Sequence, residues 1–581
     1  MRNAEIAEAL SDLATLYELD GAVRYRILAY REAARVVRQS PTSVAELARE
    51  GRATELPGIG KTLEGKIRAL VETGEIPAMT KLLAKFPPSL IEVTKVPGVG
   101  AKTARRLYDE LSVTSLADLR AAAEGERIRG LRGLGPKVEE NVLAALGELA
   151  DGGPSGRLLL SEVLPVATEL ADALRAHPAS VEVEVAGSAR RLAETCKDID
   201  LIATASDPLA LGRALGEHSL VAVAGTPHGS GSRATTHNGV KVDLRIVAPD
   251  AYGNLLQHFT GSAEHNIQLR ERAVAMGLSV SEHGIADVEG GEVARYRTEA
   301  EVYERIGLAY IEPELREGTD EIAAAAAGML PRLVSAADIR GDLHCHTTLS
   351  DGRASLEEMA TAARERGYAY LAVTDHSASH GFGNHVTPEQ LERRIAEVRE
   401  WNASARSGFR LLAGSEVNIY PDGSLDYADE LLAELDWVVA SVHTSFRISA
   451  AAMTERVIAA IEHPLVDCIG HLTGRLIGRR EPYDIDVERV AQAAQRTGTM
   501  LEINGNPNRR DLSERHARLA AEIGALISVN TDAHRTRTLG NMTYGLATAR
   551  RAWLTKERVA NTRPWRDLER LRPRNRRGRR S

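Results

Sequence analysis

The sequence predicts a multidomain chain with helical domains at its N-terminus, a central α/β region and a C-terminal barrel of seven βα units. Periodic apolar residues with short Pro-Gly and Gly-x-Gly turns run through residues 1 to about 150. β-type runs interleave with helical ones from about residue 155. After a helix and linker at 319–338, strand-like runs alternate with amphipathic helices. A chain of 581 residues is too long for one core, so we expect roughly three to five domains.

The composition is that of a water-soluble globular protein, with 43% hydrophobic and 27% charged residues. Its three cysteines, Cys196, Cys345 and Cys468, are far apart and show no CxxC spacing, which argues against disulfides or a thiolate zinc site. The acidic N-terminus is unlike a signal peptide, and no run of about 18 apolar residues predicts a membrane span. A net charge of −8 still permits a local basic groove.

Three similar glycine turns punctuate the helical region: LPGIGK at 56–61, VPGVGAK at 96–102 and LRGLGPK at 131–137. In each, a Gly-x-Gly turn opens a helix, and the free amide groups at the helix start can donate to a phosphate. The turns resemble helix-hairpin-helix elements, which hold the DNA backbone without reading sequence. The expected DNA contacts are Gly58, Gly60, Gly98, Gly100 and Lys102. The third copy departs at its proline position, which leaves a purely structural role open.

A carboxylate cluster is predicted in the central region. Asp198 and Asp200 are two residues apart on a strand and therefore share a face, while Ile199 faces a core. The later run 241–247 alternates cleanly and places Asp243 on its polar face. Pairing the two strands gathers three carboxylates, and such a cluster requires cations for neutralisation. Two Mg²⁺ or Mn²⁺ ions would serve phosphoryl transfer there.

The wording Gly-Ser-x-Arg-Arg-x-x-Glu-x-x-x-Asp-Ile-Asp at 187–200 resembles the nucleotidyltransferase palm of family X DNA polymerases, of which DNA polymerase β is the familiar member. The similarity runs from residue 1 to about 318. It implies that Asp198, Asp200 and Asp243 are catalytic. The nucleotide-binding residues it implies are Gly187, Ser188, Arg191, His258, Phe259, Gly261, Asn266 and Arg270. Vertebrate members carry tyrosine at the position of His258, so sugar selectivity and fidelity stay open.

The N-terminal segment YRILAYR at 25–31 resembles the small lyase-type domain of that family. Lys66 lies one helical turn after the first glycine turn and falls on that domain's Schiff-base position. Two interpretations stay open for Lys66: a surface lysine near a phosphate, or an amine that forms a Schiff base with an abasic sugar.

Metal-type ligands follow six of the seven apolar runs in the last third of the chain. The predicted ligands are His344, His346, Asp351, His376, Glu416, His443, His471, Asp532 and His534. The remaining run, at 500–504, ends in polar residues only. Strand C-termini converge on one mouth of a βα-barrel, so these side chains are expected to meet there. Nine mixed nitrogen and oxygen ligands suit about three ions of Mn²⁺, Zn²⁺ or Fe, which would generate a nucleophile for attack on phosphorus.

This last third resembles the polymerase and histidinol phosphatase (PHP) domain, a distorted seven-stranded βα-barrel, with all nine of that family's ligand positions filled. The fusion resembles the bacterial family X DNA polymerases. It implies short-gap filling in base excision repair, with a 3′–5′ exonuclease in the barrel, and it leaves an abasic-site endonuclease activity there open. The implied partners are gapped or primer–template DNA and deoxynucleoside triphosphates, for a monomer in the cytoplasm that associates with the nucleoid during repair. An alternative is a phosphoesterase whose polymerase-like half only positions DNA; a third, a non-catalytic scaffold, conflicts with the complete ligand sets.

The expected domain boundaries complete the prediction. They are a lyase-like domain at 1–85, a fingers-type domain at 86–150, a palm at 151–250, a thumb at 251–318, a linker at 319–338, a PHP barrel at 339–562 and a basic tail at 563–581. The tail holds nine arginines against two acids. We expect it to be disordered, either as a solvated tail or as a weak contact to nucleic-acid phosphates.

Overall fold

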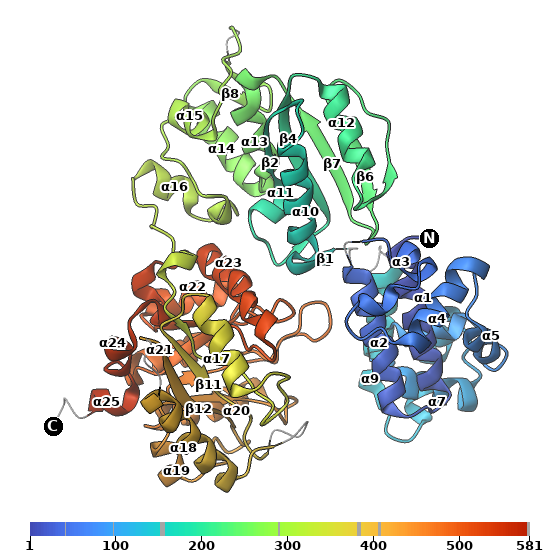
Figure 1. The fold of residues 1–581 in the computed structure, drawn as a ribbon, viewed down its shortest axis with the longest axis vertical. Coiled ribbons are helices and arrows are strands. Elements are labelled where there is room, and N and C mark those ends of the chain that lie inside the picture. Colours follow the sequence, from blue (N-terminus) through green and yellow to red (C-terminus); the bar gives the residue numbers. More distant parts are fainter. Residues whose placement is uncertain are drawn as a thin grey trace. The chain divides into compact units, whose positions relative to one another are not determined.

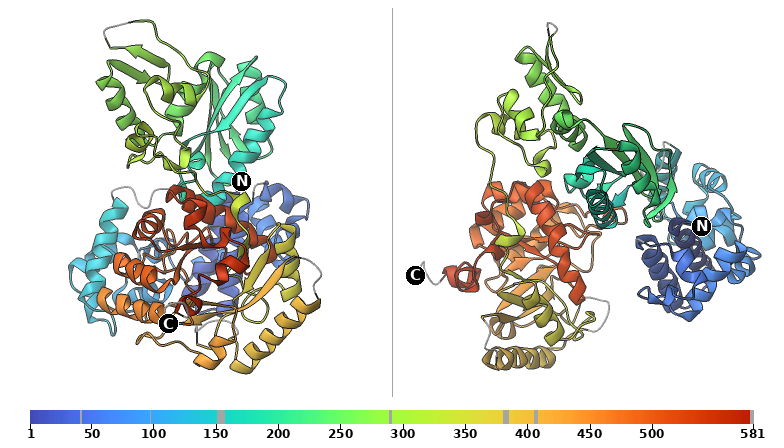
Figure 2. Two further views of the ribbon diagram at one scale, coloured as in Figure 1. Left: turned by 90° about the vertical axis from the view of Figure 1, so that its left-hand side faces the viewer. Right: turned by 45° about the horizontal axis from the view of Figure 1, so that its top comes forward.

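The structure is a computed structural model that describes residues 1–40, 42–96, 98–150, 157–288, 291–379, 385–404 and 408–577. Figures 1 and 2 show the ribbon coloured along the sequence. The chain divides into two compact units. The first comprises Met1–Leu158, Glu162–Ala186 and Cys196–Tyr252. The second comprises Leu159–Ser161, Gly187–Thr195 and Gly253–Ser581. The segment that carries Gly187, Ser188 and Arg191 therefore belongs to the second unit, although the predicted palm spans 151–250.

The described residues of the N-terminal region form helices, as predicted. They are α1 (Asn3–Leu19), α2 (Arg24–Gln39), α3 (Val44–Arg49), α4 (Lys61–Thr73), α5 (Pro77–Leu83), α6 (Ser89–Thr94), α7 (Ala101–Leu111), α8 (Leu116–Glu124) and α9 (Pro136–Ala150). Helix α1 supplies the centre of the core, because Ile6, Leu10 and Leu13 are completely buried. Apolar residues at this helical spacing bury one stripe against neighbouring helices. The core extends to the residues beside each glycine turn, such as Ile59 and Val99.

A five-stranded sheet follows in the first unit, with the strand order β2-β4-β7-β6-β5. Its strands are β2 (Ser180–Val185), β4 (Asp198–Ala205), β5 (Val221–Ala224), β6 (Gly231–Thr236) and β7 (Lys241–Ile246). Strands β4 and β7 are parallel, and the other neighbours are antiparallel. Helices α10 (Leu160–Arg175) and α12 (Pro208–Glu217) accompany the sheet. Val242, Leu244 and Ile246 are buried while Lys241 is exposed, so the predicted alternation along this strand is confirmed.

The second unit begins its main run with α13 (Tyr252–Thr260), α14 (Ala263–Ala275), the hairpin β8 (Leu278–Ser281) and β9 (Gly284–Asp287), α15 (Glu299–Arg305) and α16 (Glu321–Ala326). A fully buried polar chain ties these elements together. His265 contacts Glu321 through Nδ1 at 2.9 Å and Tyr303 through Nε2 at 2.9 Å. A buried polar group needs such partners because it has lost its contacts with water.

The barrel has seven parallel strands, as predicted, and they are arranged in sequential order. They are β10 (Gly341–Asp342), β11 (Tyr370–Val373), β12 (Arg410–Asn418), β13 (Trp437–Ser441), β14 (Cys468–Ile469), β15 (Met500–Asn504) and β16 (Ile527–Asn530). One helix follows each strand: α17 (Leu356–Glu365), α18 (Pro388–Ser404), α19 (Asp429–Ala433), α20 (Ala450–Glu462), α21 (Val487–Thr497), α22 (Glu514–Ile523) and, after the last strand, α23 (Met542–Arg551). Two apolar clusters fill the barrel interior and the layer between strands and helices.

The first and last strands of the barrel meet just beyond their C-terminal ends. A parallel bridge joins Cys345 to Ala533, and His346 donates its backbone amide to the Ala533 carbonyl at 2.8 Å. Buried Asp342 accepts the backbone amides of His344 and Thr531 at 3.3 and 3.2 Å. Burial raises the pKa of Asp342 to about 6, and hydrogen bonds from Thr531 oppose the rise. This carboxylate therefore links the two ends of the sheet.

Two sequence predictions about the barrel chain were wrong. Glu416 does not end its strand, because β12 continues to Asn418. The basic tail is also not disordered where the structure describes it. Helices α24 (Trp565–Glu569) and α25 (Pro573–Arg577) form there, and buried Arg572 donates to both oxygens of Asp467 at 2.9 Å. The last part of the predicted tail, 578–581, lies outside the described residues, as does the start of the predicted palm at 151–156.

All three cysteines are free and buried. Within the described part of the chain, every helix is too short or too polar to cross a membrane. The predicted linker contains the helix α16 and packs through Leu333 and Val334, each of which belongs to an apolar cluster of the second unit.

Candidate active sites

The three central aspartates occupy two neighbouring parallel strands. Asp198 and Asp200 lie on β4, and Asp200 is paired in register with Asp243 of β7. Ile199 between them is completely buried, as the alternation predicted. Asp243 accepts a hydrogen bond from Arg245 at 2.9 Å. Its carboxylate therefore has a positive neighbour within its own strand, which offsets part of the repulsion among the three acids.

An open cavity of about 430 Å³ adjoins these carboxylates. Asp198 and Asp243 line it from β4 and β7, and Arg233 and Lys241 add positive charge from β6 and β7. Among the described residues, the groups of acids and histidines whose ligand atoms all lie within 4.8 Å of one another are in the barrel, and the aspartates are not among them.

The residues expected to bind the nucleotide gather within the second unit. Gly187 and Ser188 begin the short helix α11 (Gly187–Arg190). Arg191 follows; it donates to the Thr260 carbonyl at 2.6 Å and to Glu317 at 3.0 Å. A Cβ atom added to Gly261 would lie 3.1 Å from Nη1 of Arg191, so a larger residue there would press on this guanidinium.

His258 and Phe259 come from α13, and Asn266 and Arg270 come from α14. Asn266 donates to the His258 carbonyl at 2.8 Å, and Nη2 of Arg270 lies 3.4 Å from Nδ1 of His258. Glu282 lies 3.9 Å from Nε2 of His258. The imidazole that stands in place of a tyrosine therefore lies between an arginine and a carboxylate.

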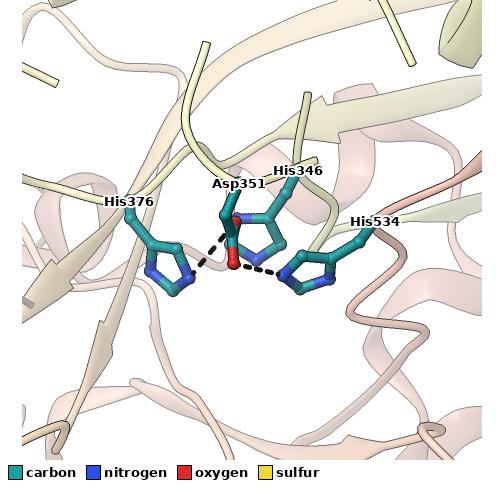
Figure 3. Close-up of side chains that lie close together, drawn as sticks. All are labelled: His346, Asp351, His376 and His534. Atoms are coloured by element: carbon teal, nitrogen blue, oxygen red, sulfur yellow. Dashed lines mark hydrogen bonds and ion pairs between the residues drawn. The ribbon is translucent and has the colours of Figure 1, made fainter. Parts of the chain in front are cut away.

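All nine predicted ligands of the barrel lie in one connected cluster. Figure 3 shows one group of four, in which Asp351 lies between His376 and His534, with His346 beside it. Asp351 is 3.1 Å from Nε2 of His534 and 3.7 Å from Nε2 of His376. Asp532 lies 3.2 Å from Nε2 of His346.

Glu416 is the centre of the cluster. Five imidazoles surround its fully buried carboxylate at 2.9–3.5 Å: His344, His346, His376, His443 and His471. His344 and His346 are two residues apart in the sequence, and both contact the Oε2 atom of Glu416. A buried carboxylate surrounded by imidazoles is a donor set that would suit divalent ions such as Mn²⁺ or Zn²⁺.

The chemistry of this donor set fits metal ions. Nε2 of His344, both ring nitrogens of His346 and both carboxylate oxygens of Glu416 are buried, yet none of these atoms makes a hydrogen bond to another described residue. Buried polar atoms that lack hydrogen bonds are costly unless something else coordinates them. His471 and Asp532 also have positive φ angles of 28° and 51°, which side chains rarely adopt outside functional sites.

The cluster changes the acidity of its members. Burial raises the pKa of Glu416, but the charges of His344, His376 and His443 bring it well below its usual range. Burial lowers the pKa of His346 to about 4, helped by the charges of His534 and His376. Neutral imidazole and ionised carboxylate are the forms that bind metal, so both shifts favour metal binding.

His534 behaves differently and leads to a pH prediction. Burial lowers its pKa, but the hydrogen bond to Asp351 and the charge of Asp532 raise it further, to about 9. The ring is therefore protonated at neutral pH in metal-free protein. Because a metal needs the neutral ring, we expect the affinity of EDTA-treated protein for Mn²⁺ to rise as pH increases from the ordinary value of 6.5 to about 9. Isothermal titration of Mn²⁺ at a series of pH values measures this rise.

The matched variants are His534→Asn and His463→Asn. His463 pairs with Asp429 at 3.1 Å on the barrel surface, away from the cluster. His463→Asn should keep the full rise of affinity with pH, and His534→Asn should show a shallower one. An equally steep rise in both variants would contradict the assignment of this proton to His534.

One important residue was missed by the sequence reasoning. Glu502 of β15 is fully buried, lies 2.7 Å from Nδ1 of His344 and accepts the backbone amide of His471 at 2.8 Å. The carboxylate thereby orients one ligand ring and holds the chain beside another. An acid inside the apolar strand 500–504 was the available signal, because Glu502 and Asn504 alternate onto the same face.

The glycine turns have one common geometry. Gly58, Gly98 and Gly133 have φ angles of 83°, 86° and 83°, and α4, α7 and α9 begin three residues after each of them. Gly60 and Gly100 have ordinary negative φ angles, and a Cβ added to either would meet no described atom within 4 Å. Nothing described in the fold therefore requires glycine at these two positions. An external group that approaches the backbone closely would require it.

Comparisons with known proteins agree with this division of the chain. Residues 1–76 match the family described as helix-hairpin-helix domain, and residues 90–148 match the SAM-like helix-hairpin-helix tandem. Residues 255–317 match the DNA polymerase beta thumb, and residues 342–506 match the PHP domain.

Whole proteins match as well. The DNA polymerase/3'-5' exonuclease PolX of Bacillus subtilis (strain 168) is 36% identical over 579 residues, covering 99% of this chain and 100% of the relative. A probable phosphatase of Thermoanaerobacter sp. (strain X514) is 35% identical over 241 residues, 38% of this chain and 89% of that protein. One from Syntrophotalea carbinolica is 29% identical over 231 residues, 38% of this chain and 90% of that protein. With a relative matched along its whole length, the chain belongs to the bacterial family X DNA polymerases that carry a C-terminal PHP domain.

Proposed function

We propose that this chain is a DNA-directed DNA polymerase that fills short gaps in base excision repair, and that its barrel removes nucleotides as a 3′–5′ exonuclease. Cleavage at abasic sites is a further expected activity of the barrel. The observation that carries the proposal is that one chain, matched along 99% of its length by a polymerase/exonuclease, has both the in-register aspartates and the nine-residue cluster.

The palm chemistry follows from the residues at hand. Asp198, Asp200 and Asp243 would hold two Mg²⁺ or Mn²⁺ ions, which when bound stabilise the charge that develops during in-line phosphoryl transfer. The turn at Gly187 and Ser188 offers helix-start amides to the triphosphate, and Arg191 adds a guanidinium. The remaining contacts are His258, Phe259 and Gly261 at the sugar, Asn266 at the base and Arg270 at the template minor groove.

The barrel chemistry needs a different donor set. The nine clustered residues would hold about three ions of Mn²⁺, Zn²⁺ or Fe, which when bound supply a nucleophile for attack on phosphorus. Five imidazole rings contact the Glu416 carboxylate. Asp351 orients His534, and Asp532 orients His346. Glu502 keeps His344 in one orientation by accepting from its other nitrogen.

A gapped duplex with a labelled primer tests the proposal. Wild-type protein should lengthen the primer when nucleotides and Mn²⁺ are present and shorten it when nucleotides are absent. His344→Ala should lose the shortening and keep the lengthening. Failure of purified protein to bind Mn²⁺ or Zn²⁺ would overturn the barrel assignment. Lengthening that persists in Asp200→Ala would contradict the palm assignment. Wild-type protein that never lengthens the primer would favour the alternative in which the polymerase-like half only positions DNA.

DNA is the proposed partner of the glycine turns, with Gly58, Gly60, Gly98 and Gly100 as backbone contacts. Lys102 is exposed on the first turn of α7 and would contact a phosphate. We expect Lys102→Ala to weaken binding of gapped DNA, because one phosphate contact is lost, and to reduce the slope of log affinity against log salt by about 0.9. Fluorescence anisotropy over a salt series measures the slope.

Lys85→Ala is the matched control, because Lys85 is already paired with Asp20 at 2.9 Å. Its slope should equal that of the wild type. An unchanged slope for Lys102→Ala would remove this residue from the DNA contact.

Three further features belong to the proposal. Lys66, half-buried on α4, is a candidate Schiff-base amine for an abasic sugar. The chain acts as a monomer on gapped or primer–template DNA with deoxynucleoside triphosphates, in the cytoplasm. Its functional parts follow the predicted boundaries: lyase-like to 85, fingers-type to 150, palm to 250, thumb to 318 and barrel from 339 to 562.

A further inference from the structure

Three arginines of the barrel chain contact the segment that follows the nucleotide-binding turn. All of these residues belong to the second unit. Arg551, at the end of α23, donates to the Arg191 carbonyl at 3.0 Å. Arg510, completely buried, donates twice to the Leu192 carbonyl at 3.1 Å. Arg475 donates to Glu194 at 3.2 Å. Leu192 itself has a φ of 54°, so the contacts hold a backbone conformation that a leucine rarely adopts.

One carboxylate is shared between the palm arginine and the barrel. The Oε1 atom of Glu317 accepts Nε of Arg191 at 3.0 Å and Nη1 of Arg551 at 2.7 Å. The side chains of both arginines are largely buried, at 14% and 6% exposure. Arg551 also donates a hydrogen bond from Nη2 to Glu514 at 3.1 Å. The Arg191 guanidinium is therefore already paired with a carboxylate of its own chain.

This pairing matters for nucleotide binding. A triphosphate can recruit the Arg191 guanidinium only if the ion pair with Glu317 is broken. Breaking it leaves a partly buried carboxylate, which is unfavourable unless another cation remains beside it. Arg551 is that cation, because it stays within 2.7 Å of the same oxygen and also holds the Arg191 backbone in place.

We propose that Arg551 is a positioning residue for nucleotide addition: it keeps Glu317 neutralised so that Arg191 is released to the triphosphate of the incoming nucleotide. The inference rests on the proposed role of Arg191 in the polymerase reaction. It assigns a residue of the barrel a part in nucleotide addition that is independent of the metal cluster.

Single-nucleotide insertion into a gapped duplex tests this, with kcat and the nucleotide KM measured separately. In Arg551→Met, Glu317 has only Arg191 as a partner and competes with the triphosphate. We expect the nucleotide KM to rise about tenfold, as for one lost charge-assisted contact, with kcat changed less than about twofold. Arg551→Lys, which keeps the positive charge, should restore most of the affinity.

The double variant Arg551→Met/Glu317→Gln gives the decisive comparison. Removing the competing charge should return KM to within about threefold of the wild type. Arg550→Met is the matched control, since the neighbouring Arg550 makes an equivalent pair with Glu314 at 2.7 Å but does not contact Arg191 or Glu317. It should leave KM unchanged. Thermal unfolding and 3′-trimming rates check that each variant is folded.

The outcomes separate this inference from the proposed function. An unchanged KM in Arg551→Met, no recovery in the double variant, or the same rise in Arg550→Met would each overturn the role of Arg551. If Arg191→Met leaves the nucleotide KM unchanged, the assignment of Arg191 to the triphosphate fails instead.

Discussion

Replacing Asp200 by asparagine is expected to reduce nucleotide addition at least about a thousandfold, because the variant keeps the shape of the side chain but removes one anionic ligand of the two metal ions. Asp200 lies on β4 directly opposite Asp243 of β7, so its loss affects the point where two strands bring their carboxylates together. The buried Ile199 beside it should keep the strand in place. Primer extension on a gapped duplex with Mg²⁺ or Mn²⁺ measures the loss.

Trimming of a 3′ end by the same preparation should be unaffected, since the barrel cluster belongs to the other unit. Asp172→Asn provides the control within the first unit, because Asp172 is 63% exposed and pairs only with Arg175 in the described contacts. It should extend primers at the wild-type rate. Asp200→Asn protein that still extends primers at more than about a tenth of that rate would contradict the palm assignment.

Replacing Glu416 by glutamine is expected to abolish hydrolysis by the barrel. The five imidazoles that surround this carboxylate would then face a neutral amide, which binds cations far more weakly. We expect the 3′-trimming rate to fall at least about a thousandfold, and Mn²⁺ or Zn²⁺ retention after dialysis to fall as well. Elemental analysis of dialysed protein and a labelled-primer assay measure the two losses.

Nucleotide addition should survive this substitution, which distinguishes loss of the cluster from general unfolding. Glu434→Gln is the control, because Glu434 is an exposed barrel carboxylate that pairs with Arg399 at 2.7 Å. Such surface pairs contribute about 0–1 kcal/mol, so metal content and trimming should not change. Full metal content together with full trimming in Glu416→Gln would show that the cluster is not the hydrolytic site.

The sequence determined by itself those features that depend on local periodicity. Alternation along β4 and β7 was enough to place Asp198, Asp200 and Asp243 on polar faces, because side chains two apart on a strand share a face. The metal-type ligands of the barrel were also predictable, because they follow apolar runs. Parallel strands of a barrel bring their C-terminal ends to one mouth whatever the details of packing.

Only the tertiary structure decided which side chains act on one another across long separations. Glu317 pairs with both Arg191 and Arg551, Glu502 reaches His344, and Asp467 anchors a tail whose composition resembled a disordered one. No local pattern encodes such contacts. An arginine-rich segment can be either solvated or buried. It is buried only where a partner distant in the sequence offsets the free energy lost when its charges leave water.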